Sequence, residues 1–137
     1  MRSELEFHDS TILSIAQAGA SIQIGIDGYI HRWDKASGVW KGEGWGQPVQ
    51  ITLTGALGSN VREYSKDLDG GSVRIGAVTH NNCIRLPFHS AGPAILQLEL
   101  KTGEVLEFTG NDIKIEVTGS GSFIEPLPDD FKPTDAG

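Results

Sequence analysis

Apolar and polar residues alternate along much of this chain. The alternation is clearest at residues 22–26, 49–53, 96–100 and 113–117, and it recurs less cleanly at 73–75, 84–88 and 105–108. A period of two puts successive side chains on opposite faces of an extended chain, so each segment predicts a β-strand with one apolar face. No long amphipathic helix is predicted, although residues 59–68 could form a short helix after a Ser or Asn cap.

Strands that each carry one apolar face must stack or close on one another to hide it. The sequence therefore predicts an all-β fold, either an antiparallel β-sandwich or a strongly curved half-barrel. Turn residues at 17–20 predict a hairpin near the N-terminus. Further turns at 101–104 and 109–112 predict a C-terminal antiparallel meander over residues 94–118.

The chain has the usual size of one domain, at 137 residues. We predict a single β-domain over residues 1–125. Residues 126–137 contain Pro126, Pro128 and Pro133 among polar and acidic residues. Such a composition is typical of an extended tail, so we expect this segment to leave the domain.

The charge is acidic, with 18 Asp and Glu residues against 11 Lys and Arg residues and a net charge of −7. The basic residues are scattered, which argues against a protein that binds nucleic acid through its phosphates. An acidic surface also repels anionic membranes. It would suit a basic protein partner, although composition alone favours the simpler explanation that the acidic residues maintain solubility.

Cysteine content and hydropathy favour a cytoplasmic protein. Cys83 is the only cysteine, so no internal disulfide can form, and we expect a reduced, partly buried thiol. The first residues lack an apolar core of signal-peptide length, and no window approaches the length of a membrane span.

The sequence contains no complete catalytic or metal-binding motif. The glycine-rich segment 42–46 lacks the context of a dinucleotide loop. Residues 67–71 match only a fragment of a calcium loop, so we expect a surface turn there. The four histidines, which lack compact metal-ligand spacing, are His8, His31, His80 and His89. We therefore predict no catalytic residue, no cofactor and no metal.

The pair His8 and Asp9 lies between two short apolar segments, 5–7 and 11–15. Adjacent residues of a strand point to opposite faces, which argues against a catalytic pair formed by these two side chains. We interpret the pair as a structural bend. Asp9 and Ser10 would accept backbone N–H groups there, and His8 would hold its ring against the sheet.

All three tryptophans lie close together, among glycines and charged residues. Trp is unfavourable in water, so each ring must pack on the core, on a neighbour or on a partner. One or two of them could plug the end of the sandwich beneath a long hairpin loop. Alternatively the region is a binding surface, because Trp and Arg are enriched at interface hot spots. The candidate binding residues are Tyr29, Arg32, Trp33, Asp34, Trp40, Glu43 and Trp45.

Residues 5–15, which read Leu-Glu-Phe-His-Asp-Ser-Thr-Ile-Leu-Ser-Ile, resemble the start of many small bacterial β-rich proteins. These begin with a Leu/Phe-His-Asp-x-x-Leu-x-x-Ile pattern, and some are grouped with immunity proteins of polymorphic-toxin and contact-dependent inhibition systems. The likeness covers about eleven residues, and only the His8–Asp9 position carries over. It implies a stoichiometric binder that covers a toxin's active site. Many such toxins are basic nucleases, whose encounter an acidic protein would accelerate.

The leading hypothesis is therefore a cytoplasmic protein that binds another, basic protein, with an immunity function as its specific form. Its electrostatic contacts would be Asp27, Asp34, Glu43, Asp67 and Asp69, with Trp40 and Trp45 beside them. A second hypothesis is an enzyme for a small molecule, which uses His80 or His89 near Cys83. It requires that at least two of His31, His80 and His89 converge on one pocket. A third is a structural module that buries the tryptophan region or a sheet edge against a second copy of the chain.

Overall fold

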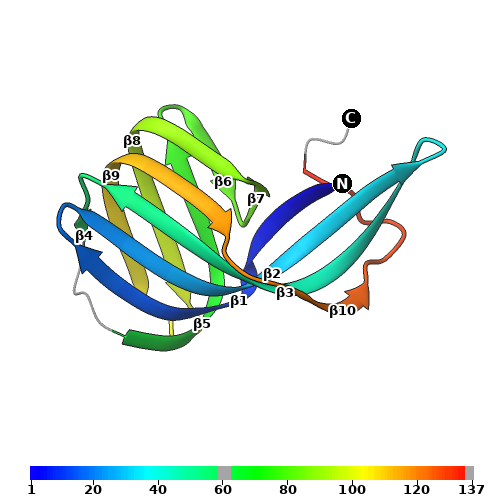
Figure 1. Cartoon of the computed structure of the whole chain (residues 1–137), viewed down its shortest axis with the longest axis horizontal. Helices are drawn as coiled ribbons and strands as arrows, with labels where there is room; N and C mark the ends of the chain where they lie inside the picture. The colour runs from blue at the N-terminus through cyan, green and yellow to red at the C-terminus, as the bar shows by residue number, and fades with distance from the viewer. Residues whose placement is uncertain (59–62, 135–137) are drawn as a thin grey trace.

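The computed structural model describes residues 1–58 and 63–134. These residues form antiparallel β-structure, with no helix among them (Figure 1). The strands are β1 (Arg2–Ala18), β2 (Ser21–Ala36), β3 (Val39–Thr54), β4 (Leu57–Gly58), β5 (Glu63–Ile75), β6 (Val78–Asn81), β7 (Cys83–Leu86), β8 (Phe88–Leu100), β9 (Val105–Val117) and β10 (Ser122–Pro126). The predicted all-β fold class is confirmed. The described part of the chain contains no helix long and apolar enough to cross a membrane.

Six strands close into a barrel in the order β1, β2, β3, β9, β8 and β5. The closing contact is an antiparallel pairing of β3 with β9, which runs from Val49 opposite Val117 to Thr54 opposite Asp112. Of the two predicted architectures, the structure is therefore the strongly curved one and not the sandwich, and its sheet curves until it closes. Closure hides the apolar faces of the six barrel strands and leaves the barrel itself without an exposed edge, while β10 and β4 remain at the ends of the strand order.

The barrel interior is filled by the apolar positions of the alternating segments. Ile24, Ile51, Leu98 and Ile115 are among the side chains with no exposed surface. The core also takes in Phe7 from β1 and Phe108 from β9, both fully buried. The barrel is thus a packed core and not an open channel.

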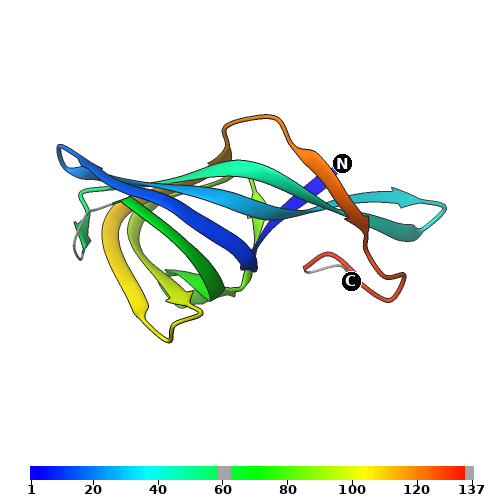
Figure 2. The ribbon, with the colours of Figure 1, turned by 90° about the horizontal axis from the view of Figure 1, so that it is seen from below.

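The strands β2 and β3 are longer than the barrel needs, and their paired ends form an arm at residues 29–46 (Figures 1 and 2). Ser37 and Gly38 form its tight turn, both with positive φ, at 52° and 78°. The first residues of β1 pair with one side of the arm, from Arg2 opposite Trp33 to Glu6 opposite Tyr29. The strand β10 pairs with the other side, through β3.

Two of the three predicted turns are confirmed, at 17–20 between β1 and β2 and at 101–104 between β8 and β9. The turn expected at 109–112 is wrong, because β9 runs through these residues without interruption. Gly110 is buried there, and its backbone passes close to Leu53 of β3. The glycine permits a close approach between strands, so the last part of the expected meander is the second half of β9.

The segment before β6 is a strand. Residues 63–68 of the possible short helix belong to β5, and residues 59–62 lie outside the described residues. The surface turn expected at residues 67–71, the calcium-loop fragment, is wrong, because these residues lie within the same strand. A register shift between Leu68 and Gly70 bends β5 there. Its glycines and aspartates mark a β-bulge.

The prediction that the chain leaves the domain after residue 125 is wrong for residues 126–134. These residues return across the arm (Figure 2). Leu127 is buried, and its N–H group donates to the carbonyl oxygen of Gly42 at 2.9 Å. The N–H group of Thr134 donates to the carboxylate of Glu4, at 3.0 and 3.2 Å from the two oxygens. We call residues 125–134 the tail segment.

Candidate functional site

The arm has two faces with different chemistry. Tyr29, His31 and Trp33 alternate along β2 and share the inner face, which the tail segment covers. Their rings meet edge to face, with centroids 5.4 Å apart for Tyr29 and His31 and 6.0 Å apart for His31 and Trp33. Glycines lie opposite all three in β3, at Gly46, Gly44 and Gly42. At Gly42 and Gly44 the absent β-carbons leave room for the Trp33 ring and the Tyr29 hydroxyl, which explains these two glycines of the glycine-rich segment.

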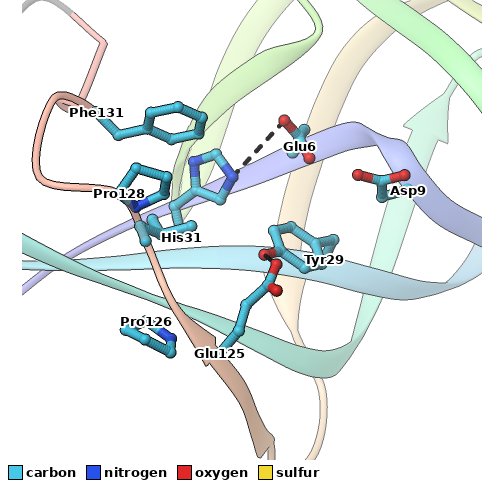
Figure 3. Close-up of a pocket in the computed structure, with 9 residues that line it drawn as sticks. Glu6, Asp9, Tyr29, His31, Glu125, Pro126, Pro128 and Phe131 are labelled. Carbon is cyan, nitrogen blue, oxygen red and sulfur yellow. Dashed lines mark hydrogen bonds and ion pairs between the residues drawn. The ribbon is translucent and has the colours of Figure 1, made fainter.

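A cavity of about 350 Å³ lies between the inner face, β1 and the tail segment (Figure 3). It is lined by Glu6, Asp9, Tyr29, His31, Glu125, Pro126, Leu127, Pro128 and Phe131. Three of these residues are carboxylates and none is Lys or Arg. The lining therefore gives the cavity a negative potential with aromatic walls.

Hydrogen bonds and burial fix the polar groups of this cavity. The Tyr29 hydroxyl donates to Oε1 of Glu125 at 2.6 Å. Burial first, and then this bond to a carboxylate, raise the pKa of Tyr29 above its usual range, so the phenol remains a donor. His31 Nε2 lies 3.7 Å from Oε1 of Glu6. The His31 side chain is only 9% exposed, and its ring points toward Glu6 (Figure 3).

The segment around His8 and Asp9 is a bend in β1. The pairing with β2 shifts register between Glu6 and Thr11, and Asp9 has a φ of 72°. The buried Ser10 hydroxyl donates to the carbonyl oxygen of Glu6 at 2.6 Å and accepts the N–H of Tyr29 at 2.9 Å. These two hydrogen bonds replace backbone hydrogen bonds between β1 and β2 that are lost at the register shift.

The argument that His8 and Asp9 must point to opposite faces is wrong. His8 Nδ1 lies 3.3 Å from Oδ2 of Asp9. Alternation holds only while both residues keep extended backbone angles, and the left-handed conformation of Asp9 ends it. Asp is among the residues that tolerate this conformation, so the signal for the bend was present in the sequence but the resulting contact was not.

The tryptophans lie on the strands of the arm and not in a long loop. Trp33 is buried on the inner face, and its Nε1 has no hydrogen-bond partner among the described residues. Trp40 is half-buried, with Lys35 Nζ 5.4 Å from its ring. Trp45 lies on the outer face beneath Arg32, whose guanidinium carbon is 3.7 Å from the ring centroid. The predicted binding residues are therefore divided between the two faces.

We define the outer face by Arg32, Glu43, Trp45 and Phe123. The Phe123 ring of β10 meets Trp45 edge to face at 5.9 Å and remains 50% exposed. Arg32 Nη2 also donates to Oε1 of Gln47 at 3.0 Å, and Trp45 Nε1 donates to Oε1 of Glu43 at 3.3 Å. The strand β10 is at the end of the strand order, with β3 as its paired neighbour. Asp34, the remaining predicted residue, lies near the tip of the arm, 3.9 Å from the terminal amine of Met1.

The histidines of the enzyme hypothesis have three different surroundings. His31 lines the cavity of the inner face. His80 lines a smaller cavity of about 160 Å³ with Cys83, and it packs edge-on against Phe88 at 5.3 Å. His89 is exposed and bonds to Oδ1 of Asp112 at 2.8 Å. Neither cavity contains a second member of this set, so the convergence that this hypothesis requires is not met there.

Sequence reasoning missed Glu6, Glu125 and Phe131 of the inner cavity. Glu6 fits the alternation of its strand, Glu125 is the last residue of the predicted domain, and Phe131 lies in the segment predicted to leave it. No protein-family model, no curated protein and no solved structure matches this chain.

Proposed function

We propose that this protein acts in the cytoplasm by binding another protein of basic net charge through the outer face of the arm. The observation that carries the proposal is the half-exposed Phe123 ring of β10, which lies edge to face on the partly buried Trp45 beneath Arg32. Trp and Arg are enriched among the residues that dominate binding energy at interfaces. A half-exposed Phe beside them supplies apolar area that a partner can cover.

The position of β10 suggests how a partner would approach. A strand at the end of a sheet presents unpaired backbone groups, and an extended segment of another protein can pair with them. The net charge of −7 favours a basic partner, because complementary charge speeds encounter and suppresses like-charged competitors. The resemblance of residues 5–15 to immunity proteins agrees with this form of action and suggests a toxin as the partner.

Affinity capture from a lysate of the source organism tests the proposal. The bait is the full chain, and the test variant is Phe123→Ser. Its matched control is Val78→Ser, because Val78 is 57% exposed on β6, away from the arm. We expect a basic protein to be captured by the wild type and the control and to be reduced at least about tenfold by Phe123→Ser. Equal capture by all three baits would reject the outer face as the binding surface.

Two further measurements separate the parts of the proposal. Reversing the charges of Asp27, Asp34, Glu43, Asp67 and Asp69 should slow association and make it less dependent on salt concentration. Unchanged association kinetics would reject the electrostatic part of the proposal.

The immunity hypothesis predicts that the captured protein stops growth when it is expressed alone. Co-expression of the wild type should then restore growth, and the Phe123→Ser variant should not. A concentration-dependent dimer in sedimentation, lost in this variant, would instead assign the surface to a second copy.

A further inference from the structure

The bend in β1 gathers three metal-ligating side chains on one side of the strand. Each of Glu6, His8 and Asp9 offers one ligand atom, and these atoms lie within 4.8 Å of one another. In a regular strand Glu6 and His8 would face one side and Asp9 the other. The positive φ of Asp9 and the register shift bring all three to the same side.

A fourth group supports the cluster from β2. The His31 side chain is more than nine-tenths buried, and its Nε2 points toward Glu6 at 3.7 Å (Figure 3). This distance is within that of an ion pair and longer than that of a hydrogen bond. His31 is therefore the group beside Glu6 that can orient this carboxylate, as outer partners of metal ligands do.

The spacing of His8 and Asp9 fits two metal ligands better than it fits a hydrogen bond. The distance from His8 Nδ1 to Asp9 Oδ2 is 3.3 Å. An N–H···O hydrogen bond has a mode of about 2.9 Å. Two ligand atoms that each lie about 2.1 Å from a tetrahedral Zn²⁺ ion are about 3.4 Å apart. The pair formed by His8 and Asp9 therefore has the separation of one edge of a coordination shell.

The position of the bend is also consistent with a cation. Glu6 and Asp9 line the negatively charged cavity of the inner face, together with Glu125. The cavity lining holds neither Lys nor Arg to neutralise them. A divalent ion at its edge would offset the repulsion among these carboxylates and would keep open positions toward the cavity for water or a small anionic ligand.

We propose that Glu6, His8 and Asp9 bind one divalent transition-metal ion of the Zn²⁺ type, and that His31 positions Glu6 for it. One imidazole with two carboxylates suits Zn²⁺, Mn²⁺ or Co²⁺ better than Ca²⁺, which takes oxygen ligands. This site uses residues of the inner face and β1, so it does not depend on the proposed binding surface of the outer face.

Calorimetric titration of the untagged full chain with Zn²⁺ at neutral pH tests this site. We expect one equivalent to bind at micromolar concentrations, and Ca²⁺ not to compete. His8→Gln and Asp9→Asn should each weaken Zn²⁺ binding about tenfold to a hundredfold or more. Asn tolerates the left-handed backbone of Asp9, so the second variant preserves the bend. His89→Gln is the matched control, because His89 is an exposed histidine paired with a carboxylate elsewhere on the barrel.

Two readouts keep the outcome independent of folding. Thermal melting of the metal-free variants shows whether each retains the fold, and added Zn²⁺ should raise the melting temperature of the wild type and of His89→Gln only. Co²⁺ should give a visible absorption band that His31→Ala shifts and His31→Gln partly restores, as expected of a positioning residue. Absence of Zn²⁺ binding by the wild type, or binding that His8→Gln and Asp9→Asn leave unchanged, would overturn the proposal. Loss of partner capture by Phe123→Ser leaves Zn²⁺ binding intact, so the two proposals fail separately.

Discussion

Ser10 shows how one small residue stabilises the bend in β1. Its hydroxyl is buried and uses both of its capacities, as a donor to Glu6 and as an acceptor from the N–H of Tyr29. A buried hydroxyl with both bonds made is favourable, whereas either partner left alone would incur a desolvation penalty of about 1–3 kcal/mol. Ser10 therefore links the backbone of β1 at Glu6 to the backbone of β2 at Tyr29, and these two residues line the inner cavity.

Cys83 allows a prediction at the same scale. Burial, with smaller contributions from the carboxylates of Glu6 and Glu4, raises the pKa of the Cys83 thiol to about 12. Only the thiolate reacts with a disulfide reagent, so at pH 8 the native thiol should react at least about a hundredfold more slowly than that of the unfolded chain. The native rate should keep rising as the pH increases beyond 9, the usual pKa of a free thiol. Because Cys83 is the only cysteine, the readout is unambiguous.

The raised pKa of Cys83 also predicts how stability depends on pH. The folded chain keeps the Cys83 proton to a higher pH than the unfolded chain does. This contribution is fully present below about pH 9 and is lost as the pH rises toward 12, so the free energy of unfolding should fall across that window. In the reaction with the disulfide reagent, a native rate that is slow but stops rising near pH 9 would show that Cys83 is protected only sterically. That result would contradict the raised pKa.

At the residue scale the sequence carries conformational preferences but not distances. Asp9 and Ser10 are residues that favour bends, and that preference could be read directly. The approach of His8 to Asp9, and of His31 to Glu6, depends on how β1 and β2 pair across the bend. Such contacts arise from register, which a single strand pattern does not contain.

At the scale of elements, the arm depends on cross-strand pairing of aromatic rings with glycines. Trp33 lies across Gly42, and a β-carbon at that position would come within 2.4 Å of the indole ring. The Tyr29 hydroxyl lies over Gly44 in the same way, 2.2 Å from such an atom. Glycine is unfavourable within a strand, so its repeated use here indicates that packing of the rings outweighs the lost strand propensity.

Alanine substitutions in β3 test this interpretation. Gly42→Ala should destabilise the protein by about 1–3 kcal/mol, because the buried Trp33 ring has little room to move. Gly46→Ala is the matched control, since its β-carbon would make an ordinary contact, 3.5 Å from Ile124. We expect that variant to change stability by less than about 0.5 kcal/mol. Urea unfolding of both variants provides the measurement, and equal effects would contradict a specific role for Gly42.

Element prediction succeeded where alternation was strong and failed where glycines had two interpretations. The hairpin turn at 101–104 could be predicted because polar turn residues separate two alternating runs. The glycine at 110 looked similar, yet it serves close packing inside β9. A short helix was possible at residues 59–68, but residues 63–68 belong to β5, which pairs with β1 and β8.

At the scale of the molecule, the barrel closes because closure buries the apolar faces of its strands, and no local sequence signal indicates this. Six strands with one apolar face each can hide those faces by closure, and the pairing of β3 with β9 completes it. The sequence predicted curvature and left a sandwich open as an alternative. The pairing of β3 with β9 could not be predicted, because an alternating pattern does not specify which strand pairs with which. The return of the tail segment could not be predicted either, because a Pro-rich and acidic segment has no alternation that marks its buried residues.

Removing residues 127–134 of the tail segment tests its role in the whole molecule. Leu127 packs beside Trp33 and Gly42 and bonds to the backbone of β3, so a chain that ends at residue 126 should expose the Trp33 ring. The measurement is acrylamide quenching in a Trp40→Phe, Trp45→Phe background, where Trp33 is the only emitter. We expect quenching to increase several-fold while the far-ultraviolet circular dichroism of the barrel is retained, because the barrel core lies within β1–β9. Chains that end at residue 134 are the control. Leu127→Ala is a milder variant, which we expect to destabilise the protein by about 2 kcal/mol. Unchanged quenching in the truncated chain and in Leu127→Ala would show that Trp33 is shielded without the tail segment.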